Sequence, residues 1–131
     1  MEYKTVDHTL KLPGTPHQVY ELLMDSDQHA AFTGGGKAEV SREVGGEFSI
    51  IDGYLSGKNL ELVQDYKIVQ SWRAKDWPEG HYSTATFILE EDEGETQLSF
   101  VQAGVPAEYY ESINEGWRTH YWAPMSKALE D

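Results

Sequence analysis

The residues that come nearest to a catalytic or metal-binding group lie in the stretch KDWPEGHYSTATF, residues 75–87. Asp76, Glu79 and His81 combine two carboxylates with an imidazole, the residue types of an acid/base pair or a metal site. A metal site needs three or four converging ligands, and the other histidines show no ligand spacing: His8, His17, His29 and His120. Short motifs of this kind often arise by accident, so the sequence predicts no catalytic residue and no metal ligand.

Other patterns that could support catalysis fail on their neighbouring residues. Gly34-Gly35-Gly36 lacks the Lys-Ser/Thr pair of a phosphate loop and does not join a strand to a helix. The serines lie outside any nucleophile elbow, and the chain has no cysteine. The acidic run 90–95 lacks the ligand spacing of a calcium loop and is typical of a solvated hairpin tip. An enzyme interpretation therefore has no support in the sequence, and no cofactor is expected.

Trp77 has two interpretations. Pro78 and Gly80 predict a turn before the strand that starts near Ser83. A tryptophan in such a turn can cover the end of a sheet, or it can project as an anchor that docks in a partner's pocket. Burial explains most aromatic side chains, so the covering role is favoured. Trp77, Glu79 and His81 remain the candidates for a partner interface.

Composition limits the class of protein. The 131 residues fit one domain, residues 1–131, and the formal net charge of −13 repels phosphate backbones and anionic lipid surfaces. Neither a nucleic acid nor a membrane is therefore an expected partner. The chain lacks cysteine, and neither a signal peptide nor an apolar run long enough to span a membrane is recognisable in it. A cytoplasmic location is therefore expected.

The first third of the chain predicts a strand and two short helices. Residues 3–12 alternate in polarity as a half-buried strand does. Thr15 and Gln18 have the spacing of a capping box, which predicts a helix from Pro16 to about Met24. Ser26 or Asp27 is expected to cap a second helix that runs through Phe32.

The remaining chain predicts a meander of six strands and one long helix. Apolar residues recur at period two between turn signals, including Leu60, Tyr66 and Ile68, so each strand can bury one face. From about Ala107 to Leu129 the apolar residues stand four apart, as in a helix, and Pro124 is expected to bend its last turns. The predicted fold class is α+β, with a curved antiparallel sheet wrapped around the long helix.

Polar residues on the inward faces raise the possibility of a cavity between sheet and helix. Gln64, Gln70 and Gln102 alternate with apolar residues, and buried amides can orient a ligand. The same glutamines can equally lie near strand ends and remain solvated. The sequence does not favour either the cavity or the solvated position. The cavity-lining candidates are Phe48, Ile50, Ile68, Gln70, Trp72, Phe87, Phe100, Gln102, Ile113, Trp117 and Tyr121.

Several motifs resemble those of the activator of heat-shock protein 90 ATPase homologue family. They are Gly45-Gly46-x-Phe48, Asp52-Gly53, Gly57, Ile68-Val69, Trp72-Arg73, Trp77-Pro78-Glu79-Gly80-His81, Gly94-Glu95-Thr96, Gly104-Val105-Pro106 and Gly116-Trp117. The resemblance covers nearly the whole chain and is similar to the carboxy-terminal domain of the co-chaperone. It implies a START-like helix-grip fold. The co-chaperone also has a separate amino-terminal domain, which is not expected within these 131 residues.

The resemblance implies a non-enzymatic domain and a heat-shock protein 90 chaperone as partner. The alternative is a carrier or sensor of a small hydrophobic molecule held between sheet and helix. A third hypothesis is an enzyme without a visible motif, since a fold does not fix a function. A filled interior would favour the interaction module, and an apolar pocket with a few polar groups would favour the carrier.

Overall fold

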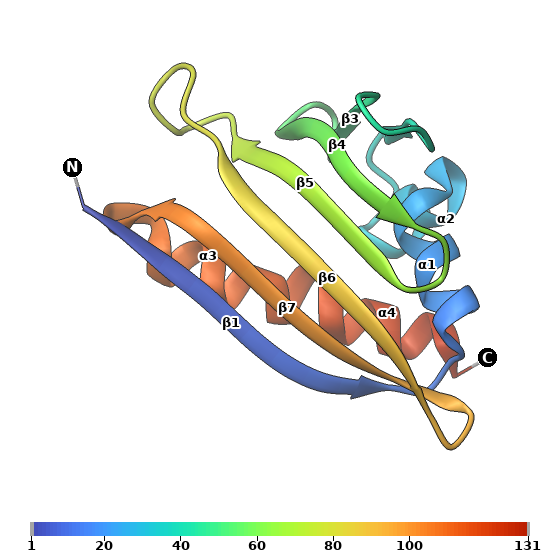
Figure 1. The fold of residues 1–131 in the computed structure, drawn as a ribbon. Coiled ribbons are helices and arrows are strands. Elements are labelled where there is room, and N and C mark those ends of the chain that lie inside the picture. Colours follow the sequence, from blue (N-terminus) through green and yellow to red (C-terminus); the bar gives the residue numbers. More distant parts are fainter. Residues whose placement is uncertain (1, 131) are drawn as a thin grey trace.

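The computed structural model describes residues 2–130, in which seven antiparallel strands form one curved sheet (Figure 1). The strands are β1 (Tyr3–Leu12), β2 (Glu39–Val40), β3 (Glu47–Ile50), β4 (Leu55–Val63), β5 (Lys67–Ala74), β6 (Ser83–Asp92) and β7 (Glu95–Pro106). Their order in the sheet is β1-β7-β6-β5-β4-β3-β2. The predicted six-strand meander is therefore confirmed, and the first strand pairs with the last.

Two short helices follow β1, as predicted: α1 (Pro16–Met24) and α2 (Ser26–Phe32). The Thr15 hydroxyl accepts from the Gln18 amide at 3.2 Å, and the Gln18 side chain accepts from the Thr15 amide at 2.9 Å. The predicted cap of the second helix is wrong, because Asp25 fills that position and accepts from the Gln28 amide at 3.0 Å. The two helices join so closely that the residue closing α1 also caps α2.

The strands bury the face that their alternation predicts, with one exception in β4. Leu60 and Tyr66 are exposed, although the period-two pattern places both on the inward face. A β-bulge between Asn59 and Glu61 adds one residue to β4, and Tyr66 falls in the turn after that strand. Asn59 continues the inward alternation of Leu55 and Gly57, so Leu60 points outward. The extra residue of the bulge then returns Leu62 to the core side.

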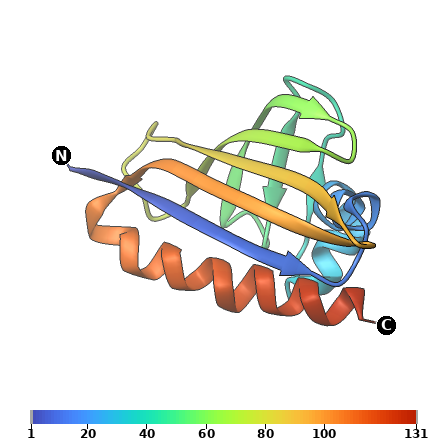
Figure 2. The same cartoon turned by 60° about the horizontal axis from the view of Figure 1, so that its bottom comes forward.

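The carboxy-terminal helix spans the predicted residues but changes its winding. It consists of a 3₁₀ turn η1 (Ala107–Tyr109), α3 (Tyr110–Trp117), a π-helical segment η2 (Arg118–Trp122) and α4 (Ala123–Leu129). An α-helix drifts by about 40° over each four residues, and the wider π turn counteracts this drift. As a result Trp117, Tyr121, Trp122 and Met125 are all buried. Figure 2 shows the helix running along one face of the curved sheet, which confirms the predicted fold class.

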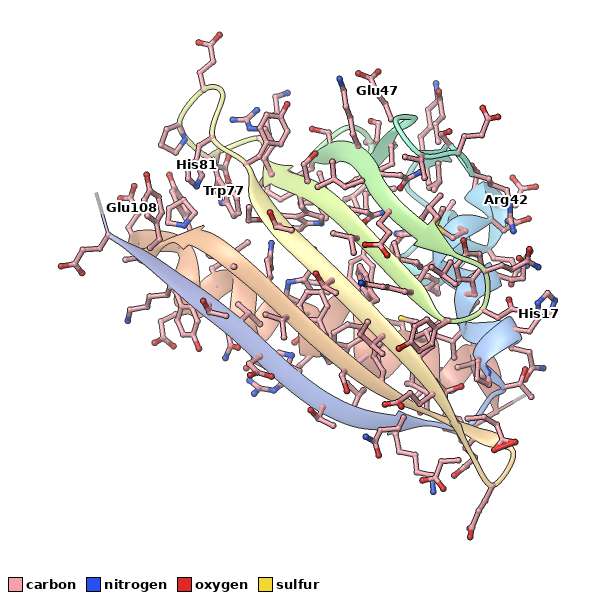
Figure 3. The ribbon with its side chains drawn as sticks, viewed as in Figure 1. His17, Arg42, Glu47, Trp77, His81 and Glu108 are labelled. Atoms are coloured by element: carbon pink, nitrogen blue, oxygen red, sulfur yellow. The ribbon has the colours of Figure 1, made fainter. Side chains whose placement is uncertain are left out.

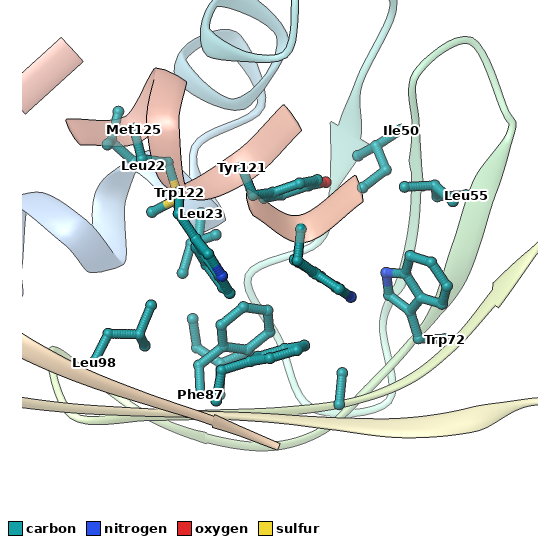
Figure 4. Packing of buried hydrophobic residues seen from close by; sticks show 14 of the residues in the cluster. Leu22, Leu23, Ile50, Leu55, Trp72, Phe87, Leu98, Tyr121, Trp122 and Met125 are labelled. Carbon is teal, nitrogen blue, oxygen red and sulfur yellow. The ribbon is translucent and has the colours of Figure 1, made fainter. Parts of the chain in front are cut away.

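Aromatic rings dominate the core between the sheet and this helix. Trp117 lies 4.3 Å from Phe100, 4.6 Å from Tyr121 and 5.3 Å from Trp122, measured between ring centroids. Figure 4 shows Tyr121 and Trp122 of the helix on the side of the sheet that carries Phe87 and Leu98. Within residues 2–130 no helix is both long enough and apolar enough to cross a bilayer.

Candidate functional site

The space between sheet and helix, where a ligand cavity is the sequence hypothesis, is almost filled. It measures about 10 Å³, and a single water molecule needs about 10–15 Å³. The candidates that line it are Phe48, Ile50, Ile68, Gln70, Trp72, Phe87, Trp117 and Tyr121. Phe100 and Gln102 are fully buried in the packing beneath it, and Ile113 lines a separate groove. The interior therefore has no volume for a hydrophobic ligand.

The inward glutamines bond to other protein groups. Gln102 accepts from the Trp117 indole Nε1 at 2.7 Å and donates to the Ser83 hydroxyl at 2.9 Å. Gln70 donates to the Asn59 side-chain oxygen at 3.0 Å. Gln64 is exposed in the turn after β4. Because a buried amide needs partners, Gln70 and Gln102 join elements of the core through hydrogen bonds. Gln64 is solvent-exposed, as the alternative to the cavity hypothesis expects.

Two histidines join the long helix to the rest of the fold. His8 accepts from the Trp122 indole at 2.9 Å through Nδ1, so its Nε2 carries the proton and donates to Asn114 at 2.8 Å. His29 donates from Nδ1 to the Leu23 carbonyl at 2.9 Å and accepts from the Tyr121 hydroxyl at 2.8 Å. In each case one ring nitrogen accepts a hydrogen bond from an aromatic residue of the helix.

Burial of His29 and Tyr121 sets the protonation of this pair. Desolvation lowers the pKa of His29, and the Leu23 carbonyl opposes this effect. Burial raises the pKa of Tyr121. Sequence reasoning missed His29, although its spacing of three residues from the buried Phe32 places both on one helix face.

The Trp77–His81 turn covers one end of the sheet. Trp77 is 3% exposed and lies against Trp72, with ring centroids 5.4 Å apart. Arg73 donates to the Trp77 and Pro78 carbonyls at 2.8 and 3.3 Å and so holds the turn closed. Figure 3 shows Trp77 and His81 at the same end of the sheet as Glu108. With its ring buried, Trp77 does not have the projecting position that an anchor requires.

The polar residues of this stretch do not act together. His81 donates from Nε2 to the Gly104 carbonyl at 2.8 Å and stacks on Tyr3 at 4.9 Å. Asp76 accepts from the Tyr54 hydroxyl at 2.7 Å, which raises the pKa of Tyr54, and Glu79 is exposed. In the described part of the chain, no three His, Asp or Glu residues gather as metal ligands would.

A groove of about 220 Å³ opens between the long helix and the turn that joins β3 to β4. Its walls are mainly apolar, with Ser112 and His120 as polar members. The lining residues are Ile51, Tyr54, Leu55, Trp72, Ser112, Ile113, Gly116, Trp117, His120 and Tyr121. Four of these residues are also candidates for the predicted cavity: Trp72, Ile113, Trp117 and Tyr121. The groove also includes residues of the β3–β4 turn, which are not among those candidates.

A curved antiparallel sheet, two short helices after its first strand and a long helix along one face define the START-like helix-grip class. A family model described as "Activator of Hsp90 ATPase homolog 1-like protein" matches residues 13–130, and the chain belongs to this family. The resemblance found in the sequence is thus confirmed.

The chain is also similar to several known proteins. The crystal structure of an HSP90 activator from Plasmodium falciparum superposes with a TM-score of 0.90 at 27% identity, over 96% of both chains. The Aha1 dimer from Colwellia psychrerythraea has the same fold, with a TM-score of 0.81 at 19% identity over 97% of this chain and 96% of the other. The human activator of 90 kDa heat shock protein ATPase homolog 1 is 35% identical over 115 residues, 88% of this chain and 34% of the relative. The chain spans about a third of the length of the curated relatives it matches.

Proposed function

We propose that this chain is a non-enzymatic interaction module that binds a heat-shock protein 90 chaperone. The observation that carries the proposal is the likeness to an HSP90 activator over 96% of both chains, together with the family match over residues 13–130. The small interior space supports it, because the enclosed space between sheet and helix has only about 10 Å³, and the surface groove of about 220 Å³ lies below the usual size of small-molecule sites.

Charge gives the proposed contact a testable property. A net charge of −13 steers the domain toward basic surfaces, and such steering weakens as salt screens it. The partner surface on the chaperone is therefore expected to be basic. Binding should weaken as ionic strength rises, mainly through slower association.

The test is a titration of human HSP90 into the labelled chain at low and at moderate salt. We expect saturable binding that weakens with salt, and the human chaperone is chosen because its activator is 35% identical to this chain. A Lys127→Glu variant, changed at an exposed residue of α4, is the control that shows how a change of net charge alone affects binding. Absence of binding at high micromolar chaperone would refute the proposed partner.

The carrier alternative predicts a different result. Apolar compounds would have to shift the NMR signals of residues that face the interior, such as Ile68 and Phe87. We expect no such shifts, because these side chains are already packed against one another. Shifts at both positions with a saturable dependence on concentration would restore the carrier hypothesis.

A further inference from the structure

The groove beside the long helix is an apolar opening at the surface, next to an enclosed interior space that is almost filled. Tyr54 and Leu55 form one wall with Ile51, and Ile113 and Gly116 form the helical wall. Figure 4 shows Ile50, Leu55 and Trp72 of the sheet facing the part of the helix that carries Tyr121. Its volume of about 220 Å³ is below the range of about 300–1,000 Å³ that is usual for small-molecule sites.

Gly116 keeps this groove open at a position where packing does not require a glycine. Glycine weakens the interior of a helix relative to alanine. A Cβ built at Gly116 meets only the His120 Cδ2 atom, at 3.9 Å, so an alanine would fit. A helix residue that is unfavourable and not enforced by its neighbours points to something that approaches the bare backbone from outside.

The opposite wall is held in a strained conformation. Ile51 has a φ of 53°, which is rare for a β-branched residue, and Asp52 has a φ of 56°. The Asp52 side chain accepts from the Lys37 amide at 2.9 Å, and the Asp52 amide donates to the Lys37 carbonyl at 3.1 Å. Strain that the surrounding structure maintains is common at binding sites, and here it fixes Ile51 over the groove.

Charge indicates the chemistry of the occupant. Asp52 follows Ile51 in the chain without lining the groove, and Asp76 accepts from the hydroxyl of Tyr54, a wall residue. The Lys75 amide donates to the Tyr54 carbonyl at 2.8 Å, His120 lines the groove itself, and the whole chain carries a net charge of −13. An apolar side chain that enters the groove is therefore best flanked by Lys or Arg, and large rings supply the most binding energy in such pockets.

We propose that the groove at Gly116 receives one aromatic or large aliphatic side chain from a basic segment of the chaperone. This inference rests on the proposed function, and it assigns the contact to the groove in place of the buried Trp77. The groove accepts a single anchor, and the acidic surroundings orient the segment that carries it.

The test compares two leucine variants on the same helix. Gly116→Leu fills the groove, and Thr119→Leu adds the same kind of bulk at an exposed position that does not line it. Circular dichroism and thermal melts establish that both variants fold. In titrations with human HSP90 we expect Gly116→Leu to lose affinity by at least about tenfold, and Thr119→Leu to bind like the native chain.

The outcomes separate this inference from the proposed function. Equal binding of HSP90 by the native chain and by folded Gly116→Leu would refute the groove as the docking site and leave the chaperone as the partner. No binding by the native chain would overturn both. A further experiment titrates indole into the native chain and follows the amide NMR signals of Ile113 and Gly116. If these signals shift and Gly116→Leu does not change HSP90 binding, the groove is a small-molecule site and the docking role is overturned.

Discussion

Replacement of Trp117 by alanine should remove much of the stability of this domain. The indole of Trp117 is 3% exposed and lies between the sheet and the helix. Its ring centroid is 5.6 Å from that of Trp72, 5.9 Å from that of Phe87 and 4.3 Å from that of Phe100. Deleting a buried tryptophan costs about 3–5 kcal/mol, because transfer energy is lost and a cavity is left behind. Small domains have a total of about 5–15 kcal/mol, so the variant is expected to approach the limit of folding.

The hydrogen bond from Trp117 to Gln102 contributes part of this loss and can be measured separately. Trp117→Phe keeps an aromatic ring but leaves the fully buried Gln102 oxygen without its donor at 2.7 Å. An unsatisfied buried acceptor costs about 1–3 kcal/mol. In a double-mutant cycle with Gln102→Leu, the effect of Trp117→Phe should shrink, since the orphaned acceptor is then absent.

The assay is urea unfolding followed by far-ultraviolet circular dichroism, which does not depend on the fluorescence of the tryptophan that is removed. A loss below about 1 kcal/mol for Trp117→Ala would mean that the side chain is exposed and that the helix presents another face to the sheet. Additive effects in the cycle would refute the proposed role of the Gln102 bond.

The unfolding free energy of the native chain should fall as the pH drops below about 6.5, the ordinary pKa of histidine in the unfolded state. Burial lowers the pKa of His29 in the folded state, so the unfolded state takes up the proton first as the pH falls. The unfolding free energy then decreases by at most about 1.4 kcal/mol per pH unit, and the decrease ends below the pKa of folded His29. Urea melts of native chain and His29→Gln between about pH 8 and pH 5.5 test this, and equal pH slopes would contradict it. Gly57→Ala should destabilise the domain by more than about 2 kcal/mol, because the added Cβ would lie 1.8 Å from the Ser71 carbonyl oxygen; a thermal melt like that of the native chain would show that β4 can move away.

The sequence by itself determined the features that depend on neighbouring residues. The capping box at Thr15, the alternation of β1 and the four-residue spacing after Pro106 gave elements with correct bounds, because caps and periodicity act within a few positions. The family motifs extended this to the arrangement of sheet and helix. Gln70 and Gln102 were placed correctly on inward faces for the same reason.

Only the tertiary structure decided what these side chains contact. The bond between Trp117 and Gln102 joins a helix to a strand, and the His29–Tyr121 bond joins residues 92 positions apart in the sequence. The burial of Trp77 and the groove at Gly116 likewise depend on elements that meet only after the sheet has curved around the helix. Local propensity carries no information about such pairs, since close packing selects them among all the surfaces that a folded chain brings together.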